Sequence, residues 1–145
     1  MIAEFHIPGL PVGKQRPKFA RVGNYTRAYT PEKTVNYENY VRLMYQQNCP
    51  GIFFDKDIPL EMKLVVWLPI PKSASKKNAE LMRLGRIRPT KKPDSSNIQK
   101  SIEDGLNGVA YHDDSQIVDS EIHRFYGTTP GVWVLIKPAG EESED

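Results

Sequence analysis

The sequence contains one cysteine, Cys49, among its 145 residues, so it can form no internal disulfide. It has no apolar run approaching the ~20 residues of a membrane-spanning helix, and no secretory signal segment. We therefore expect a cytoplasmic protein without a membrane partner. Cys49 lies beside Asn48 and Pro50 with no histidine nearby, which favours a packed thiol over a nucleophile.

Composition is ordinary for a globular chain, with 39% hydrophobic and 26% charged residues. A chain of this length usually forms one domain with a sizeable core. We expect a single domain over residues 1–138. The acidic segment 139–145 is expected to form a tail without fixed structure.

The net charge of +2 conceals a segregation of charge. Residues 14–27 include five basic side chains and no acidic one, and residues 72–92 include eight basic side chains against Glu80 alone. One such run is usually a solvated surface. Two runs that flank an acidic cluster favour a phosphate-backbone partner.

Hydrophobic periodicity predicts strands at 2–7, 60–70, 116–125 and 131–136 and helices at 31–47, 74–84 and 95–107. Residues 64–68 form a continuous apolar run typical of a buried strand, and the last two strands should pair as an antiparallel hairpin. Residues 11–30 are interpreted as a basic loop or irregular hairpin. We expect an α/β (α+β) fold, with a mixed sheet of about four strands against about three helices.

The most informative stretch is 93–117. Asp94, Ser95 or Ser96 can cap a helix whose apolar face carries Ile98 and Ile102. The polar face of this helix and the strand that follows it carry the residues Asn97, Lys100, Ser101, Asp104, Asp113 and Asp114. Oxygen ligands from separate elements suit a hard divalent cation, and a lysine could stabilise developing negative charge. Taken singly, each residue is more often a cap, a surface ion pair or a turn residue than a functional group.

Three strings together resemble the signature of the RusA-type Holliday-junction resolvases. They are Lys-Pro-Asp-x-x-Asn-x-x-Lys at 92–100, Asp-Gly-Leu-Asn-Gly-Val at 104–109 and Tyr-x-Asp-Asp-Ser-Gln-Ile at 111–117, with echoes at 14–17 and 29–31. The resemblance implies a homodimeric, magnesium-dependent endonuclease of prophage type, acting in DNA recombination and repair. It implies that four-way junctions are cut by paired nicking, with Mn²⁺ as a possible substitute for Mg²⁺.

By this resemblance Asp94 and Asp114 are metal-binding catalytic residues and Lys100 is the catalytic lysine. Asp113 and Asp104 are candidates for completing the metal site. The expected DNA contacts are Lys14, Arg16, Lys18, Lys76, Lys77, Arg86, Arg88, Lys91 and Lys92. His112, beside the acidic pair, is expected to be an exposed loop residue without a role.

Ser96 departs from the family pattern, which typically has a second acidic residue at this position. A neutral hydroxyl is a weaker ligand than a carboxylate, so metal affinity should fall unless another residue compensates. An alternative hypothesis is therefore a junction-binding protein that cuts weakly or not at all, since basic residues dominate affinity for DNA. A nuclease acting on other branched DNA or on RNA ranks below both.

Overall fold

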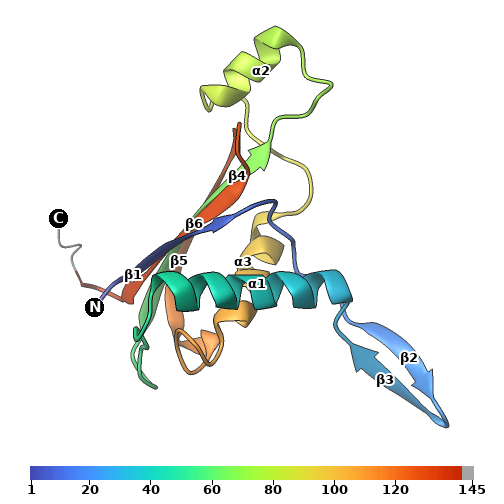
Figure 1. Cartoon of the computed structure of the whole chain (residues 1–145), viewed down its shortest axis with the longest axis vertical. Coiled ribbons are helices and arrows are strands. Elements are labelled where there is room, and N and C mark those ends of the chain that lie inside the picture. Colours follow the sequence, from blue (N-terminus) through green and yellow to red (C-terminus); the bar gives the residue numbers. More distant parts are fainter. Residues whose placement is uncertain (142–145) are drawn as a thin grey trace.

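The computed structural model describes residues 1–141, and residues 142–145 of the predicted acidic tail lie outside the described part. A four-stranded mixed sheet forms the centre, in the order β1-β6-β4-β5 (Figure 1). The strands are β1 (Ala3–Pro8), β4 (Leu60–Pro69), β5 (Ile117–Gly127) and β6 (Gly131–Pro138). The predicted α+β class with a small mixed sheet is confirmed.

The order of the strands corrects one prediction. β5 and β6 do not pair with each other, because β4 lies between them, parallel to β5 and antiparallel to β6. The predicted hairpin assumed that consecutive strands pair, which is a tendency rather than a rule. The chain reaches β5 from β4 through two helices, which is the long crossover that a parallel pair requires.

The core lies on one face of the sheet. β4 alternates strictly, with Leu60, Met62, Leu64, Val66 and Leu68 buried and the intervening side chains half-buried. The prediction of a continuous buried run at 64–68 was therefore wrong for Val65 and Trp67, which point to the less covered face. Alternation of this kind shows that helices cover the sheet from one side.

Helices α1 (Glu32–Asn48) and α3 (Ser95–Leu106) supply that cover, lying against the same side of the sheet (Figure 1). They approach closely at Gly105, where an added Cβ would lie 2.8 Å from the carbonyl oxygen of Glu38. α1 buries Tyr37 and Val41 and leaves Val35 exposed. Pro31 is its N-cap.

Helix α2 (Lys76–Arg83) is capped by Ser75. It buries no residue, and Leu84, just past its end, is exposed. α2 therefore projects beyond the sheet instead of covering it (Figure 1). A second projection is the hairpin of β2 (Lys18–Val22) and β3 (Tyr25–Tyr29), which extends from the N-terminal end of α1.

The ordered chain extends into the predicted acidic tail. Ala139 N–H donates to the carbonyl of Pro59 at 2.8 Å, so the ordered chain continues past 138.

No helix in the described part of the chain is long and apolar enough to cross a membrane.

Candidate functional site

The segment before β2 packs against the N-terminal half of α3. Lys14 N–H donates to the carbonyl of Asn97 at 2.8 Å, and the Ser101 hydroxyl lies 2.7 Å from the carbonyl oxygen of Val12. A Cβ added at Gly13 would lie 2.9 Å from Cβ of Pro93, so a larger residue would push the two segments apart. This close fit brings the basic N-terminal segment alongside the acidic helix.

Asp94 is the N-cap of α3. Its Oδ1 accepts a hydrogen bond from Asn97 N–H at 3.1 Å and one from the Ser96 hydroxyl at 3.3 Å. The carboxylate is exposed and lies at the positive end of the helix dipole, which favours negative charge there. Ser96 thus stands beside Asp94, at the position where the resemblance anticipates a second acid.

Arg124, on β5, holds the segment that leads into Asp94. Its guanidinium donates to the carbonyl of Lys91 at 3.0 Å and to that of Pro93 at 2.8 Å. The Lys92–Pro93 peptide bond is cis. Asp94 is therefore positioned both by its own helix and by a side chain from the neighbouring sheet.

A chain of ion pairs runs from α1 across α3. Lys100 Nζ lies 3.0 Å from Asp104 Oδ1 and 3.2 Å from Asp114 Oδ2. The other oxygen of Asp104 lies 3.0 Å from Lys14 Nζ, and Lys14 also pairs with Glu38 at 3.2 Å. Lys100 is half exposed, whereas the Asp104 carboxylate is mostly covered.

These contacts shift the titration of all three central groups. The hydrogen bond to Asp104 raises the pKa of Lys100 above its ordinary value, outweighing partial desolvation. Burial opposes ionisation of Asp104, yet hydrogen bonds from Lys100 and Lys14 lower its pKa overall. Burial would likewise lower the pKa of Lys14, but hydrogen bonds to Asp104 and Glu38 raise it. Lys100 is consequently an ammonium at neutral pH, suited to electrostatic stabilisation rather than to proton abstraction.

Asp114 opens a short 3-10 turn, Asp114–Gln116, just before β5. Its Oδ2 accepts from Lys100 and from Asn107 Nδ2 at 3.2 Å. Asp113 caps the same turn and forms a capping box with Gln116. The hydrogen bond from Ser115 lowers the pKa of this exposed carboxylate. Asp113 thus has a local structural role in addition to any chemical one.

Glu103 is a partly buried acid in the same neighbourhood. Its Oε2 is buried without a hydrogen-bond partner, and so is Oδ1 of Asn107. Burial raises the pKa of Glu103, and the charge of Asp114 raises it further. A buried oxygen without a partner in the protein can accept a hydrogen bond from a bound water or coordinate a cation.

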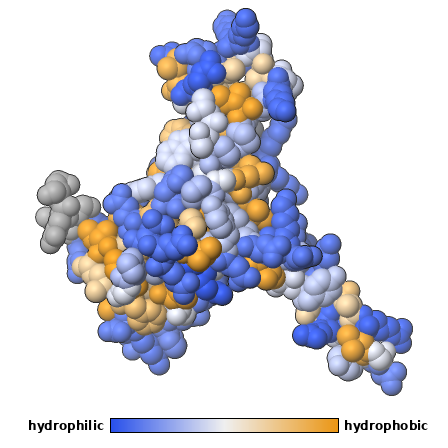
Figure 2. Space-filling model, viewed as in Figure 1, coloured by the Kyte–Doolittle hydropathy of each residue, from blue (hydrophilic) through white to orange (hydrophobic). Residues whose placement is uncertain are grey.

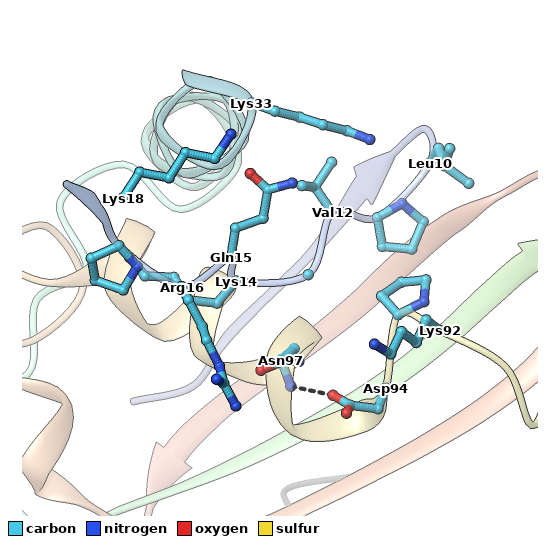
Figure 3. Close-up of a pocket in the computed structure, with 14 residues that line it drawn as sticks. Leu10, Val12, Lys14, Gln15, Arg16, Lys18, Lys33, Lys92, Asp94 and Asn97 are labelled. Atoms are coloured by element: carbon cyan, nitrogen blue, oxygen red, sulfur yellow. Dashed lines mark hydrogen bonds between the residues drawn. The ribbon is translucent and has the colours of Figure 1, made fainter. Parts of the chain in front are cut away.

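An open cleft of about 910 Å³ adjoins Asp94. Among its lining residues are one carboxylate and several basic side chains, arranged around a common opening in Figure 3: Lys14, Arg16, Lys18, Lys33, Lys92 and Asp94. Lys14 is turned toward its two carboxylates, but Arg16, Lys18, Lys33 and Lys92 are exposed. The cleft is therefore electropositive and leads up to the N-terminus of α3.

The structure separates the other residues predicted to contact DNA. Lys76 and Lys77 lie on the projecting helix α2, away from the cleft lining. The Arg88 guanidinium stacks over the ring of Phe125 at 4.2 Å and donates to the carbonyl of Arg124. These two contacts of Arg88 stabilise the linker between α2 and α3. Arg86 and Lys91 are exposed along the same linker.

The predicted metal ligands are not gathered at one point. Within residues 1–141, no three acidic, histidine or cysteine side chains come together as a group that could hold a metal. Asp94 is six residues, or about 9 Å of helix axis, from Lys100, whereas Asp114 contacts Lys100 directly. The donors at both places are carboxylate, hydroxyl and amide oxygens, which is the set that Mg²⁺ or Mn²⁺ prefers.

Sequence reasoning missed four residues of this site. Asn107 orients Asp114, Arg124 supports the approach to Asp94, Lys33 lines the cleft, and Glu103 adds a partly buried acid. Glu103 lies three residues after Lys100 and four residues before Asn107, a spacing that was a usable signal for one helix face. No local pattern pointed to Arg124 or Lys33, which come from other elements.

An electropositive cleft that ends at a carboxylate-bearing helix terminus is suited to binding a phosphate backbone. The comparisons with known proteins identify the family. The sequence profile described as "Endodeoxyribonuclease RusA" matches residues 8–137. The chain belongs to this family of DNA-hydrolysing nucleases.

A curated relative is similar to this chain over nearly its whole length. The "Uncharacterized protein YqaN" of Bacillus subtilis (strain 168) is 35% identical over 136 residues, covering 92% of this chain and 94% of the relative. Membership of the family implies endonuclease activity on branched DNA, and RusA resolvases generally depend on a divalent metal. The resemblance inferred from residues 92–118 is thereby confirmed.

Proposed function

We propose that this protein is a magnesium-dependent, structure-selective endonuclease that resolves four-way DNA junctions by paired nicking. The observation that carries the proposal is the position of Asp94 at the end of the electropositive cleft, with Lys100 and Asp114 in contact further along α3 and its following turn. Mn²⁺ is a possible substitute for Mg²⁺ because it accepts the same oxygen ligands.

In the proposed mechanism Asp94 and Asp114 would supply carboxylate ligands to the divalent metal, with Asp113 assisting, although in the described chain these carboxylates are not gathered at one point. When bound, the divalent cation supplies a water nucleophile at neutral pH and charge neutralisation on the scissile phosphate. Water attacks phosphorus and gives up a proton to solvent, the bond from phosphorus to one sugar oxygen breaks, and that oxygen takes up a proton from solvent. The Lys100 ammonium stabilises the negative charge that develops at the phosphate or on this leaving oxygen.

Asp104 is better suited to positioning than to metal binding. Each of its oxygens already pairs with a lysine, so its charge is balanced within the protein. We assign Asp104 to holding Lys100, and we assign Lys14 to holding Asp104. This assignment replaces our expectation that Lys14 contacts DNA directly.

Arg16, Lys18 and Lys92 line the cleft and remain the favoured phosphate contacts near the site. Lys76, Lys77, Arg86, Arg88 and Lys91 form a second basic region on α2 and the linker. A four-way junction has two-fold character, so a two-fold homodimer would present one site to each of two opposed strands. Contacts from both subunits would then hold the separate arms of the junction.

The decisive experiment is cleavage of a synthetic four-way junction, with and without Mg²⁺ or Mn²⁺, beside a linear duplex of the same length. Symmetric, metal-dependent nicking of the junction alone is expected. Asp94→Asn should abolish nicking while keeping the helix cap, because asparagine caps about as well as aspartate. Full metal-dependent activity in Asp94→Asn would refute the assignment.

A second candidate function is a junction-binding protein that cuts weakly or not at all. The Ser96 hydroxyl lies 3.3 Å from Asp94 Oδ1, at the position where an acidic ligand is anticipated. Loss of one carboxylate weakens metal binding but leaves the basic cleft unchanged. Tight junction binding without nicking in either metal would favour this function.

A further inference from the structure

The β2–β3 hairpin is the most exposed element of the described chain. Its two strands pair only with each other, and every residue in both strands is exposed. Figure 1 shows it extending away from the sheet and from α1. An isolated two-stranded hairpin is only marginally stable in water, so an arm of this kind gains stability from a binding partner.

The hairpin combines positive charge with exposed aromatic rings. Lys18, Arg21 and Arg27 lie on its strands, which carry no acidic residue. Phe19 is 71% exposed and Tyr25 is 64% exposed. Figure 2 shows apolar surface interleaved with hydrophilic surface over this arm. Rings left in solvent among cations are typical of surfaces that stack on nucleobases and contact phosphates.

The strand register places both basic and aromatic side chains on each face of the arm. Lys18 is opposite Tyr29, and Val22 is opposite Tyr25, with Arg27 between them on the same face. The other face carries Phe19 and Arg21. A two-stranded ribbon of this kind can enter a DNA groove or lie between two duplex arms.

The arm continues the electropositive cleft. Lys18 begins β2 and lines the cleft together with Arg16, and the same cleft ends at Asp94. Positive charge therefore runs without an acidic interruption from the hairpin to the proposed catalytic end of α3. A DNA strand whose phosphate lies at Asp94 can follow this path outward along the hairpin.

We propose that the β2–β3 hairpin is a DNA-binding arm that grips branched DNA outside the catalytic centre. Lys18, Arg21 and Arg27 contact backbone phosphates, while Phe19 and Tyr25 stack on base faces exposed at the branch point, where base stacking is interrupted. This inference rests on the proposed function. DNA fits the arm better than a second copy of the chain does, because an arm whose only charges are positive would meet a protein of net charge +2.

The test measures junction affinity by fluorescence anisotropy in EDTA, over a series of salt concentrations. Arg21→Gln and Arg27→Gln should each weaken binding and reduce the slope of log K against log salt by about one. Phe19→Ala and Tyr25→Ala should weaken junction binding about 5- to 100-fold with little change in slope. They should affect linear duplex far less, because base stacking is continuous in a linear duplex and leaves no exposed base face between its ends.

Lys56→Gln and Phe53→Ala are matched controls, since both side chains are exposed in the loop beyond the opposite end of α1. They should leave affinity and slope at the wild-type values. Arm variants should keep the wild-type melting temperature because none of their side chains lies in the core. Sedimentation measures whether each variant keeps the wild-type oligomeric state.

Wild-type affinity and slope in all four arm variants would overturn the inference while leaving the proposed function intact. A change of oligomeric state in the arm variants, with affinity per assembled unit unchanged, would overturn it in favour of a contact between copies. Failure of the wild-type protein to bind a junction at all would overturn the proposed function together with the arm.

Discussion

The Lys100 ammonium lies 3.0 Å from Oδ1 of Asp104, one helical turn further along α3. The other oxygen of Asp104 is at the same distance from Lys14. The Asp104 carboxylate lies between the two lysines. Loss of either ion pair would leave a partly covered charge without its partner. This contact ties the position of the proposed catalytic lysine to the N-terminal segment.

Asp104→Asn should destabilise the protein at neutral pH. The folded-state pKa of Asp104 lies below its ordinary value of 3.8, so its contribution is present above that pH and is lost as pH falls through the lower folded value. We expect a loss of about 1–2 kcal/mol at pH 7, moderated because Lys100 is half exposed. Urea denaturation of the wild type and the variant at pH 7 and below pH 3 measures the free energy of unfolding of each protein. The difference between the two proteins should shrink at the lower pH.

The matched control is Glu80→Gln, which breaks the exposed pair with Arg83. That pair should contribute less than about 0.5 kcal/mol. An equal loss for Asp104→Asn at both pH values would show that the effect is steric and not electrostatic.

Lys100→Met should separate catalysis from binding. Loss of the ammonium removes transition-state stabilisation and should slow single-turnover nicking by about 10²- to 10³-fold. Junction affinity should stay within a few-fold of wild type, because many phosphate contacts share it. Lys56→Met, at an exposed loop position, serves as the charge-matched control. A parallel loss of affinity would make Lys100 a DNA contact instead.

Ser96→Asp should strengthen the metal site. The new carboxylate would lie beside that of Asp94, where the Ser96 hydroxyl now donates to Oδ1. Two adjacent acids bind a divalent cation more tightly than an acid and a hydroxyl do. We expect at least about a 10-fold lower Mg²⁺ requirement for nicking and tighter Mn²⁺ binding by calorimetry.

Ser95→Asp is the control for Ser96→Asp, because it adds the same charge to the first turn of α3 at the neighbouring position. Equal effects of the two substitutions would indicate a general effect of charge. No gain from Ser96→Asp would mean that serine suffices as the second ligand.

Glu103→Gln should stabilise the protein at neutral pH. Burial raises the folded-state pKa of Glu103 above its ordinary value of 4.5, so ionisation costs stability as pH rises from 4.5 through the folded value. Replacing the acid with an amide removes this cost, and we expect a gain of about 1 kcal/mol or less. Thermal unfolding at pH 7 and pH 3 tests this, because the gain should vanish where both states are protonated. A loss of stability at pH 7 would show that the Glu103 charge is compensated in the fold.

Much of the site was predictable because the interactions within α3 join residues that are close in the sequence. Asp94 caps α3 and Ile98 and Ile102 face the core, as capping chemistry and helical periodicity predicted. The Lys100–Asp104 pair follows from the i, i+4 spacing alone. The partners of Lys14 could not be predicted, because Glu38 and Asp104 lie far from it in the sequence. The roles of Asp94, Lys100 and Asp114 in catalysis stay predictions until they are tested.

By itself, the sequence determined the elements of the protein, because capping, periodicity and turn chemistry act over a few residues. It also determined the family, because the motif at 92–118 is a contiguous string. Only the tertiary structure decided that β4 lies between β5 and β6, that Arg124 supports Asp94, and that the hairpin stands clear of the core. Those features depend on which distant segments pack together, and packing is decided by the whole chain.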